Sequence, residues 1–110
     1  MRPVSVGINP TAGATTTVYT VPTGYYALFN LMYIHNTGGN SKHITAQWYD
    51  ASAGTSIDIL TAVTYNSKAY TQFSGAYIVF EEGDQLRVTP EAASSFAVVA
   101  TFEETGLTRQ

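Results

Sequence analysis

The sequence predicts an all-β protein, a single antiparallel β-sandwich that is jelly-roll-like and has about eight strands. Two observations lead to this prediction. Thr, Val, Tyr, Ile and Phe dominate the chain, and Gly, Asn, Ser or Pro interrupt them roughly every eight to twelve residues, as in sandwiches and barrels. No segment has an apolar face with the period of a helix, so strands do not alternate with helices and the sheets should be antiparallel.

The length of the chain indicates one domain. Its 110 residues should bury roughly 65% of the surface that the unfolded chain exposes. We expect an N-terminal extended arm over residues 1–14, a β-sandwich domain over 15–104 and a polar C-terminal tail over 105–110. The sequence has no cysteine, which excludes disulfides and thiolate metal sites.

The first strands follow from short runs of β-branched and aromatic residues. Val4–Ile8 is either a weak first strand or part of the arm, and Thr15–Val21 is a strand that ends at the turn Pro22-Thr23-Gly24. Tyr25–His35 is apolar on both faces, so it should be a central strand with one face on the core and the other against a neighbouring subunit. Its two expected faces are Tyr25, Ala27, Phe29, Leu31 and Tyr33, and Tyr26, Leu28, Met32 and Ile34.

The next strand, Lys42–Asp50, alternates cleanly between core and solvent. Ile44, Ala46 and Trp48 should point into the core, because side chains two residues apart share a face. The opposite face would carry His43, Thr45, Gln47 and Tyr49. The remaining strands are bounded by small or polar residues, and we expect them at Ile57–Val63, Ala69–Phe73, Tyr77–Phe80, Gln85–Thr89 (with Leu86 and Val88 inside) and Phe96–Phe102.

The segment FEEGDQLRVTP, Phe80–Pro90, concentrates charge in a chain that is otherwise poor in it. Glu81-Glu82-Gly83-Asp84 lies between two strand-like segments, and Gly83 can adopt a positive φ at low cost. We therefore predict a tight hairpin with solvated carboxylates. A calcium loop would need more oxygen ligands at alternating positions, and a glycosidase would need a second carboxylate across a cleft, for which Glu103 and Glu104 are candidates.

The two histidines, His35 and His43, lie at equal distances from Gly39 in the sequence. A simple hairpin centred there would place them opposite each other, where two imidazoles could share a metal ion. Two ligands make a poor metal site, and further ligands would have to come from a symmetric oligomer. The favoured interpretation is two polar residues at the rim of a hairpin.

Charge and motif content exclude several classes of function. A net charge of −3 with five Lys and Arg provides no basic surface for nucleic acid. No apolar run approaches the roughly 18 residues of a membrane span. The sequence also lacks a nucleophile paired with a base and a glycine-rich phosphate loop, so we expect neither an enzyme nor a cofactor.

The same low charge favours a protein–protein interface. Charged residues make up 12% of the chain, against about 25% in typical soluble domains. So few charges cannot cover a free surface, and we expect a homo-oligomer or a larger assembly. Sugar binding by tyrosine rings is a less favoured alternative. The candidate interface residues are Tyr25, Tyr26, Phe29, Tyr33 and Tyr49.

Three segments together resemble a widespread group of small virion proteins of tailed bacteriophages. VYTVPTGYYALFNLMYIHNTGG (18–39) resembles the opening strands of that group, and ITAQWYD (44–50) resembles the strand that follows. IVFEEGDQLRV (78–88) with FAVVATFEE (96–104) resembles its hairpin and its final, acidic-ended strand. The resemblance covers residues 15–104, and the lead MRPVSVGINPTAGA departs from it and could be an arm on a neighbour.

The resemblance implies a structural protein of the virion, assembled in the host cytoplasm and without a catalytic motif. The favoured role is a capsid decoration or cement protein that stabilises the shell through contacts with the major capsid protein or other virion proteins. Such groups often form trimers. The alternatives are a tail- or fibre-attached structural protein and a carbohydrate-binding β-sandwich module.

Overall fold

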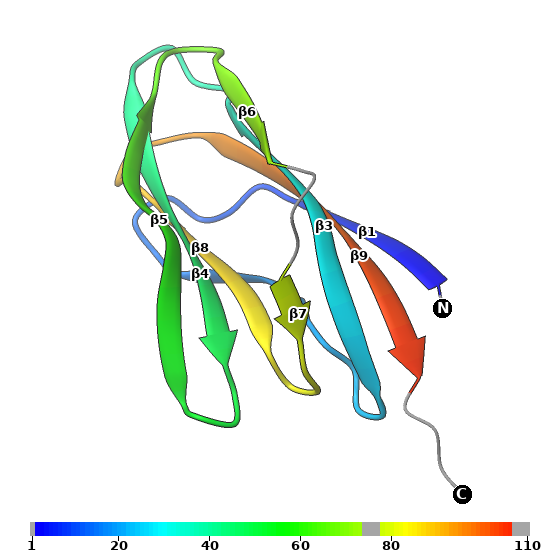
Figure 1. Ribbon diagram of the computed structural model, residues 1–110. Coiled ribbons are helices and arrows are strands. Elements are labelled where there is room, and N and C mark those ends of the chain that lie inside the picture. The colour runs from blue at the N-terminus through cyan, green and yellow to red at the C-terminus, as the bar shows by residue number, and fades with distance from the viewer. Residues whose placement is uncertain (1, 74–77, 107–110) are drawn as a thin grey trace, which may run out of the picture.

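The computed structural model describes residues 2–73 and 78–106, and it confirms an all-β sandwich of two antiparallel sheets (Figure 1). The described residues include no helix, and hence none long and apolar enough to cross a membrane. The strands are β1 (Arg2–Ile8), β2 (Thr16–Thr20), β3 (Tyr25–Asn36), β4 (Lys42–Asp50), β5 (Thr55–Tyr65), β6 (Tyr70–Phe73), β7 (Ile78–Phe80), β8 (Gln85–Pro90) and β9 (Phe96–Gly106).

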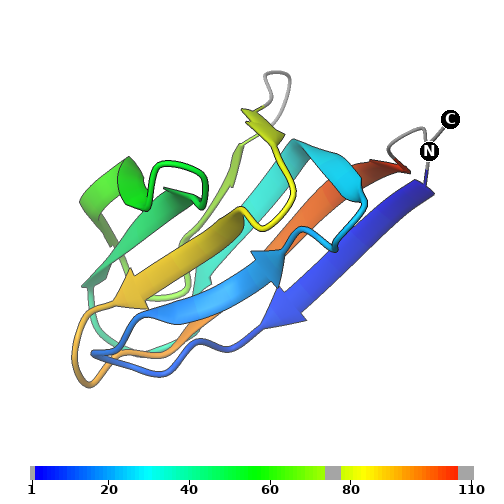
Figure 2. The same ribbon diagram turned by 90° about the horizontal axis from the view of Figure 1, so that it is seen from below.

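The strand order is that of a jelly roll. Sheet A has the order β1-β9-β3-β6, with β7 also paired to β3, and sheet B has the order β2-β8-β4-β5. Figure 2 shows the two sheets as layers seen from below. The chain changes sheet at most of its connections, so residues far apart in sequence become neighbours.

Two predicted hairpins are wrong, because the strands on either side of each turn belong to different sheets. His35 in β3 pairs with Ala97 and Tyr70, and His43 in β4 pairs with Thr64, so the two histidines do not face each other. Likewise, residues 81–84 connect β7 in sheet A to β8 in sheet B. The turn itself is confirmed, since the Asp84 amide donates to the Glu81 carbonyl at 2.9 Å and Gly83 has a φ of 86°.

The N-terminal segment forms the first edge of sheet A. Of the two alternatives for Val4–Ile8, the structure has the strand, which pairs with β9 from Arg2↔Glu104 to Ile8↔Val98. Val4, Val6 and Ile8 pack against the core. At the other end of the chain, β9 continues to Gly106. The predicted Tyr77 and Ser74-Gly75, and the last residues of the expected tail, lie outside the described part.

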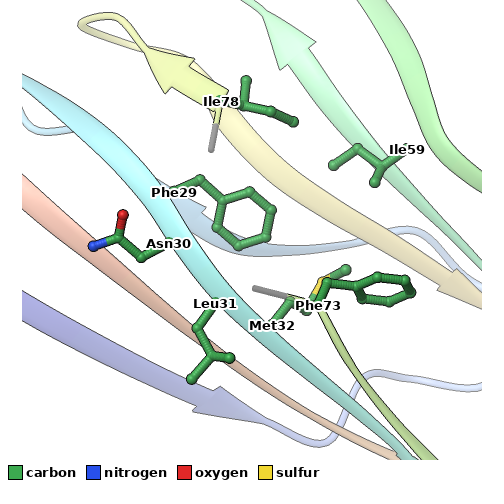
Figure 3. Close-up of a pocket in the computed structure, with 7 residues that line it drawn as sticks. All are labelled: Phe29, Asn30, Leu31, Met32, Ile59, Phe73 and Ile78. Carbon is green, nitrogen blue, oxygen red and sulfur yellow. The ribbon is translucent and has the colours of Figure 1, made fainter. Parts of the chain in front are cut away.

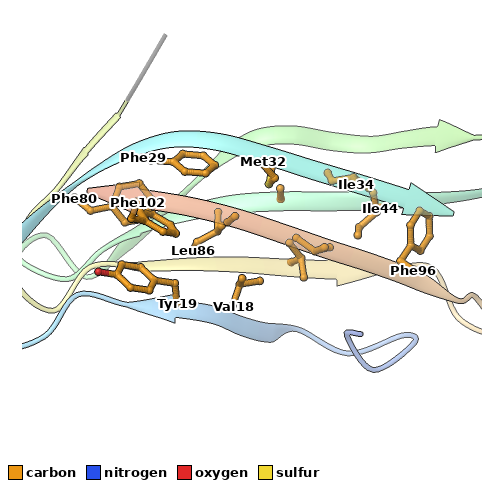
Figure 4. Close-up of a cluster of buried hydrophobic side chains, with 14 of the residues drawn as sticks. Val18, Tyr19, Phe29, Met32, Ile34, Ile44, Phe80, Leu86, Phe96 and Phe102 are labelled. Atoms are coloured by element: carbon orange, nitrogen blue, oxygen red, sulfur yellow. The ribbon is translucent and has the colours of Figure 1, made fainter. Parts of the chain in front are cut away.

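The core is anchored by aromatic side chains at one end of the sandwich (Figure 4). The ring of Phe102 stacks on Tyr19 with centroids 3.9 Å apart, and it also contacts Phe29 and Phe80 at 5.1 and 5.4 Å. At the other end, Phe96 meets Tyr65 edge to face. Aliphatic side chains fill the space between the two ends, and the buried ones include Met32, Ile34, Ile44, Leu86, Val88 and Val98.

An irregularity in β3 changes the predicted faces of that strand. Its register against β9 shifts between Phe29 and Leu31, so Asn30 is an extra residue. Beyond this bulge the inward side chains are Met32, Ile34 and Asn36, all fully buried, and Leu31 and Tyr33 point outward. The prediction was therefore right up to Phe29 and wrong after it.

The predicted faces of β4 and β8 are confirmed. Ile44, Ala46, Leu86 and Val88 are fully buried. Trp48 is on the same face and packs against Phe80 with ring centroids 6.2 Å apart, although it is only partly buried.

The carboxylate of Asp84 is buried, which corrects the expectation that all the acidic groups of this turn are solvated. Its side chain accepts hydrogen bonds from Trp48 Nε1 at 3.1 Å, the Ala51 amide at 2.9 Å and the Glu81 amide at 2.9 Å. Asp84 is 1% exposed, whereas Glu81 and Glu82 are exposed as predicted. Asp84 thus ties the β7–β8 turn to the β4–β5 loop.

A second buried carboxylate, Glu104, joins β1 to the core. Arg2 Nε donates to Glu104 Oε1 at 2.7 Å, and the Tyr19 hydroxyl donates to Oε2. Burial acts to raise the pKa of Glu104, but the hydrogen bonds from Tyr19 and Arg2 and the charge of Arg2 outweigh it and lower this pKa. Burial and the same hydrogen bond raise the pKa of Tyr19, so its hydroxyl remains a donor at ordinary pH.

The lowered pKa of Glu104 predicts a specific acid sensitivity. Because the folded-state pKa is below the unfolded value, the stabilisation is complete above the usual value of 4.5 and is lost as pH falls through the folded pKa. We expect Glu104→Gln to flatten the acid side of a plot of unfolding free energy against pH, as measured by urea titration. Glu103→Gln, on the outer face, is the control and should leave the acid side unchanged. Equal slopes in wild type and Glu104→Gln would contradict the prediction.

Candidate protein–protein interface

The predicted interface residues do not form one surface. Phe29 is a core residue, 7% exposed, so its assignment to an interface was wrong. Tyr49 lies on the outer face of sheet B, with the guanidinium carbon of Arg87 3.9 Å from its ring centroid. Tyr33 lies on the outer face of sheet A and is exposed.

The other two tyrosines lie together at the start of β3. Tyr25 packs against the core, and the guanidinium carbon of Arg2 lies over its ring, 4.7 Å from the ring centroid. Tyr26 is partly buried and pairs with Thr105, on the outward side of the strand. The predicted set therefore divides among the core, both outer faces and one end of the sandwich.

The outer face of sheet A carries apolar side chains on β9, β3, β6 and β7, whereas β1 presents Ser5 there. Tyr33 pairs with Val99, and the centroids of the Tyr33 and Tyr70 rings are 6.5 Å apart. Leu28 pairs with Val79. Several of these side chains are well exposed, with Tyr70 at 68% and Val79 at 46%. We call this surface the sheet A face, and it comprises Leu28, Leu31, Tyr33, Tyr70, Val79, Ala97 and Val99.

Uncharged polar side chains also lie on this outer face, with His35 beside Ala97 and Tyr70, and Gln72 beside Tyr33, but formal charge is nearly absent from it. Among the described residues that point outward from its strands, Glu103 alone has a formal charge, and it lies at one end beside Leu28. Ser5 and Thr101 bond to each other through their hydroxyls at 2.9 Å. A surface with so little charge has a low cost of desolvation, and exposed apolar patches of this kind mark protein interaction sites.

The outer face of sheet B has the opposite character. Thr15 bonds Thr89 at 2.8 Å, and Gln47 Nε2 donates to Asp58 at 2.8 Å. Arg87 Nε donates to Gln85 at 2.7 Å while its guanidinium covers Tyr49. These polar groups bond to one another within the chain, so they are not left unpaired.

Three exposed residues of the sheet A face, Tyr70, Val79 and Val99, are not among the predicted interface residues. A signal was present in β9, where Phe96, Val98, Ala100 and Phe102 alternate as core residues and therefore turn Val99 outward. No comparable signal exists for β6 and β7, which are too short to show an alternation.

One side of the sandwich has a small apolar cavity of about 170 Å³ between β3, β5, β6 and β7 (Figure 3). The side chains of Phe29, Met32, Ile59, Phe73 and Ile78 surround it, whereas those of Asn30 and Leu31 point away. A ligand pocket normally adds a few polar groups that orient its ligand. The side chains that surround this cavity have none.

The described residues contain no group of three or more His, Asp or Glu side chains that could hold a metal ion. His43 lies instead beside Glu91, with Nε2 and Oε1 3.6 Å apart.

No protein-family model matches the sequence, and no curated protein does. Among solved structures, the chain is similar to a protein of Bacillus endospore appendages, described as disulfide-linked pili, with a TM-score of 0.58 and 14% identity over 97% of this chain and 87% of that one. It is also similar to a protein of the T13 IBDV viral particle, with a TM-score of 0.51 and 8% identity over 97% of this chain and 36% of that one. At such low identity, these likenesses show a β-sandwich fold that occurs in a pilus protein and a virus-particle protein.

Proposed function

We propose that the protein is a structural component of a tailed-phage virion, and specifically a decoration protein that binds the capsid as a homo-oligomer. The observation that carries this proposal is the contrast between the two outer faces. The sheet A face is apolar and nearly free of charge, whereas the outer face of sheet B is polar and internally hydrogen-bonded. One face is therefore suited to burial against protein and the other to solvent.

The size of the molecule is compatible with this role. It measures 54 × 25 × 20 Å along its principal axes. A stable protein–protein interface buries about 800 Å² on each partner. The broad side of the sandwich is large enough to supply such an area.

A decoration protein that binds a capsid through a broad non-covalent contact requires neither a cofactor nor a covalent link. The chain has no cysteine and so cannot form the disulfide links named for the pilus protein. Each subunit of a decoration protein adds a modest stabilisation, and the symmetry of a capsid repeats that contact many times.

The proposal predicts that variants of the sheet A face assemble poorly while they fold normally. The double variant Tyr70→Ser and Val99→Thr should change the free energy of unfolding by no more than about 1 kcal/mol, because both side chains are exposed. Its self-association, measured by sedimentation equilibrium, and its attachment to purified particles should both weaken by at least about tenfold. The matched control is Tyr49→Ser, which removes a tyrosine from the opposite face.

Two results would contradict the proposal. One is equal attachment by wild type and the double variant, and the other is an equal loss with Tyr49→Ser. Quantification of the protein in purified particles then separates the roles within the virion. A decoration protein is present in hundreds of copies, whereas a tail- or fibre-attached protein is present in few.

A further inference from the structure

A second cavity, larger than the apolar one, lies at the end of the sandwich where β3 begins and β7 ends. It has a volume of about 400 Å³, within the range of small-ligand sites. Two aromatic residues, one aliphatic residue and three polar residues line it, namely Tyr25, Tyr26, Val79, Ser52, Glu81 and Glu82. We call it the end pocket. It is separate from the centre of the sheet A face, where Tyr33, Tyr70 and Val99 lie.

The loops that form the end pocket are joined to one another. The buried Asp84 carboxylate accepts from the amides of Ala51 and Glu81, which links the β4–β5 loop to the β7–β8 turn. The Val21 amide donates to the Asp84 carbonyl at 3.0 Å, and the Gly24 amide donates to Glu82 Oε2 at 2.8 Å. The pocket is thus held in shape before any ligand binds, which lowers the entropic cost of binding.

The polar atoms of the end pocket are mainly acceptors. Glu81 and Glu82 contribute two carboxylates, and the Ser52 hydroxyl already donates to Asp50 at 2.9 Å. Among the described residues the ion pairs use Glu104 and Glu91, so neither Glu81 nor Glu82 has a cationic partner within 4.0 Å. The Tyr26 ring adds negative potential at its faces, as does the face of the Tyr25 ring that the Arg2 guanidinium does not cover. Guanidinium and ammonium groups, which have donors and no acceptor, complement this set.

The same end of the molecule already holds one guanidinium in such surroundings. Arg2 lies against the Tyr25 ring at 4.7 Å and donates to the Glu104 carboxylate at 2.7 Å. A carboxylate and a tyrosine ring therefore bind an arginine side chain within this protein.

We propose that the end pocket binds an arginine or lysine side chain of a partner protein, as a polar anchor beside the apolar sheet A face. The identity of the partner as a virion protein rests on the proposed function, but the recognition of a cation does not. This cationic side chain would orient the partner protein, and the apolar side chains of the sheet A face would supply the area of the contact.

The test uses the isolated full-length chain and three small probes, with amide shifts in ¹H–¹⁵N spectra as the readout. The probes are N-acetyl-arginine amide, N-acetyl-lysine amide and N-acetyl-citrulline amide, the last a neutral isostere of the first. We expect the two cationic probes to shift the amides of residues 24–26, 51–54 and 79–83, and citrulline to leave them unchanged. A stronger response to arginine or to lysine identifies the preferred side chain.

Variants locate the site. Replacing Glu81 and Glu82 together by Gln should weaken the binding of the arginine probe by at least about fivefold, the size expected for two partly exposed ion pairs. Asp58→Asn, a carboxylate on the outer face of sheet B, is the matched control and should bind the probe as wild type does. Both variants should keep the dispersed spectrum of the folded chain.

Three outcomes would overturn the proposal. They are no shift at the end pocket with either cationic probe, an equal response to citrulline, and shifts with methyl glycosides in place of the cations. Unchanged particle attachment in the Tyr70 and Val99 variant would contradict only the proposal for the sheet A face, so the two proposals fail independently.

Discussion

Replacement of Asp84 by alanine is expected to lower the free energy of unfolding by about 3–5 kcal/mol, because it leaves buried donors without an acceptor. The carboxylate accepts three hydrogen bonds, from Trp48 Nε1, the Ala51 amide and the Glu81 amide. Each donor left unpaired costs about 1–3 kcal/mol, and the losses overlap because the loops can relax. Urea unfolding followed by the fluorescence of Trp48, the single tryptophan of the chain, measures the effect directly.

The neighbouring carboxylates provide the control for this variant. Glu81→Gln together with Glu82→Gln should change stability by no more than about 0.5 kcal/mol, since both side chains are exposed. Asp84→Asn keeps one acceptor oxygen and should fall between the two. A loss of less than about 1 kcal/mol for Asp84→Ala would show that water can replace the carboxylate and that the turn does not depend on it.

Replacement of Phe102 by alanine should cost a similar amount, about 3–5 kcal/mol, through a cavity in the core. Phe102 is fully buried and contacts the rings of Tyr19, Phe29 and Phe80. Its strand, β9, lies between β1 and β3, so the surrounding backbone cannot easily collapse into the space. Thermal and urea unfolding should show the loss in the same direction.

A matched variant on the same strand tests whether burial is the cause. Val99→Ala removes an outward side chain and should cost less than about 1 kcal/mol. Phe102→Leu keeps most of the apolar volume and gives a measurable, smaller loss if the alanine variant does not fold. Equal losses for Val99→Ala and Phe102→Ala would contradict the assignment of inner and outer faces in β9.

The contrast between Asp84 and its neighbours shows which features of this turn the local sequence predicts and which it does not. Gly83 and the acidic residues around it predict a turn, and the turn is present with Gly83 at positive φ. Two of the three donors to Asp84, however, come from β4 and the loop that follows it, more than thirty residues earlier in the chain. No local pattern distinguishes an acidic residue that will find such donors from one that stays in water.

The composition predicts a protein–protein interface but not its position, and the interface itself stays a prediction. Low charge and many tyrosines predict that some outer surface is covered by protein, and the sheet A face is a surface of that kind. The alternation expected along β3 was wrong beyond the bulge at Asn30, which places Met32 in the core and the interface candidate Tyr33 on the sheet A face. A bulge depends on how β3 meets β9, and a single strand does not reveal it.

The sequence by itself determined the fold class and, to within a few residues, the position of every strand from β2 onward in the described part of the chain, whereas it left Val4–Ile8 open between a strand and an arm. It could do so because β-branched and aromatic residues, the two-residue alternation and the Gly, Pro and Asn turns act over short distances. Only the tertiary structure decided which strands pair. β1 joins β9 from the opposite end of the chain, and the turns after β3 and β7 lead into the other sheet. The side-chain amide of the buried Asn36 donates to the carbonyls of Asn40 and Tyr65. These bonds stabilise the connection by which the chain passes from sheet A to sheet B. Such long-range pairings depend on burying both apolar faces and every backbone donor at once, a condition of the whole chain that no short segment contains.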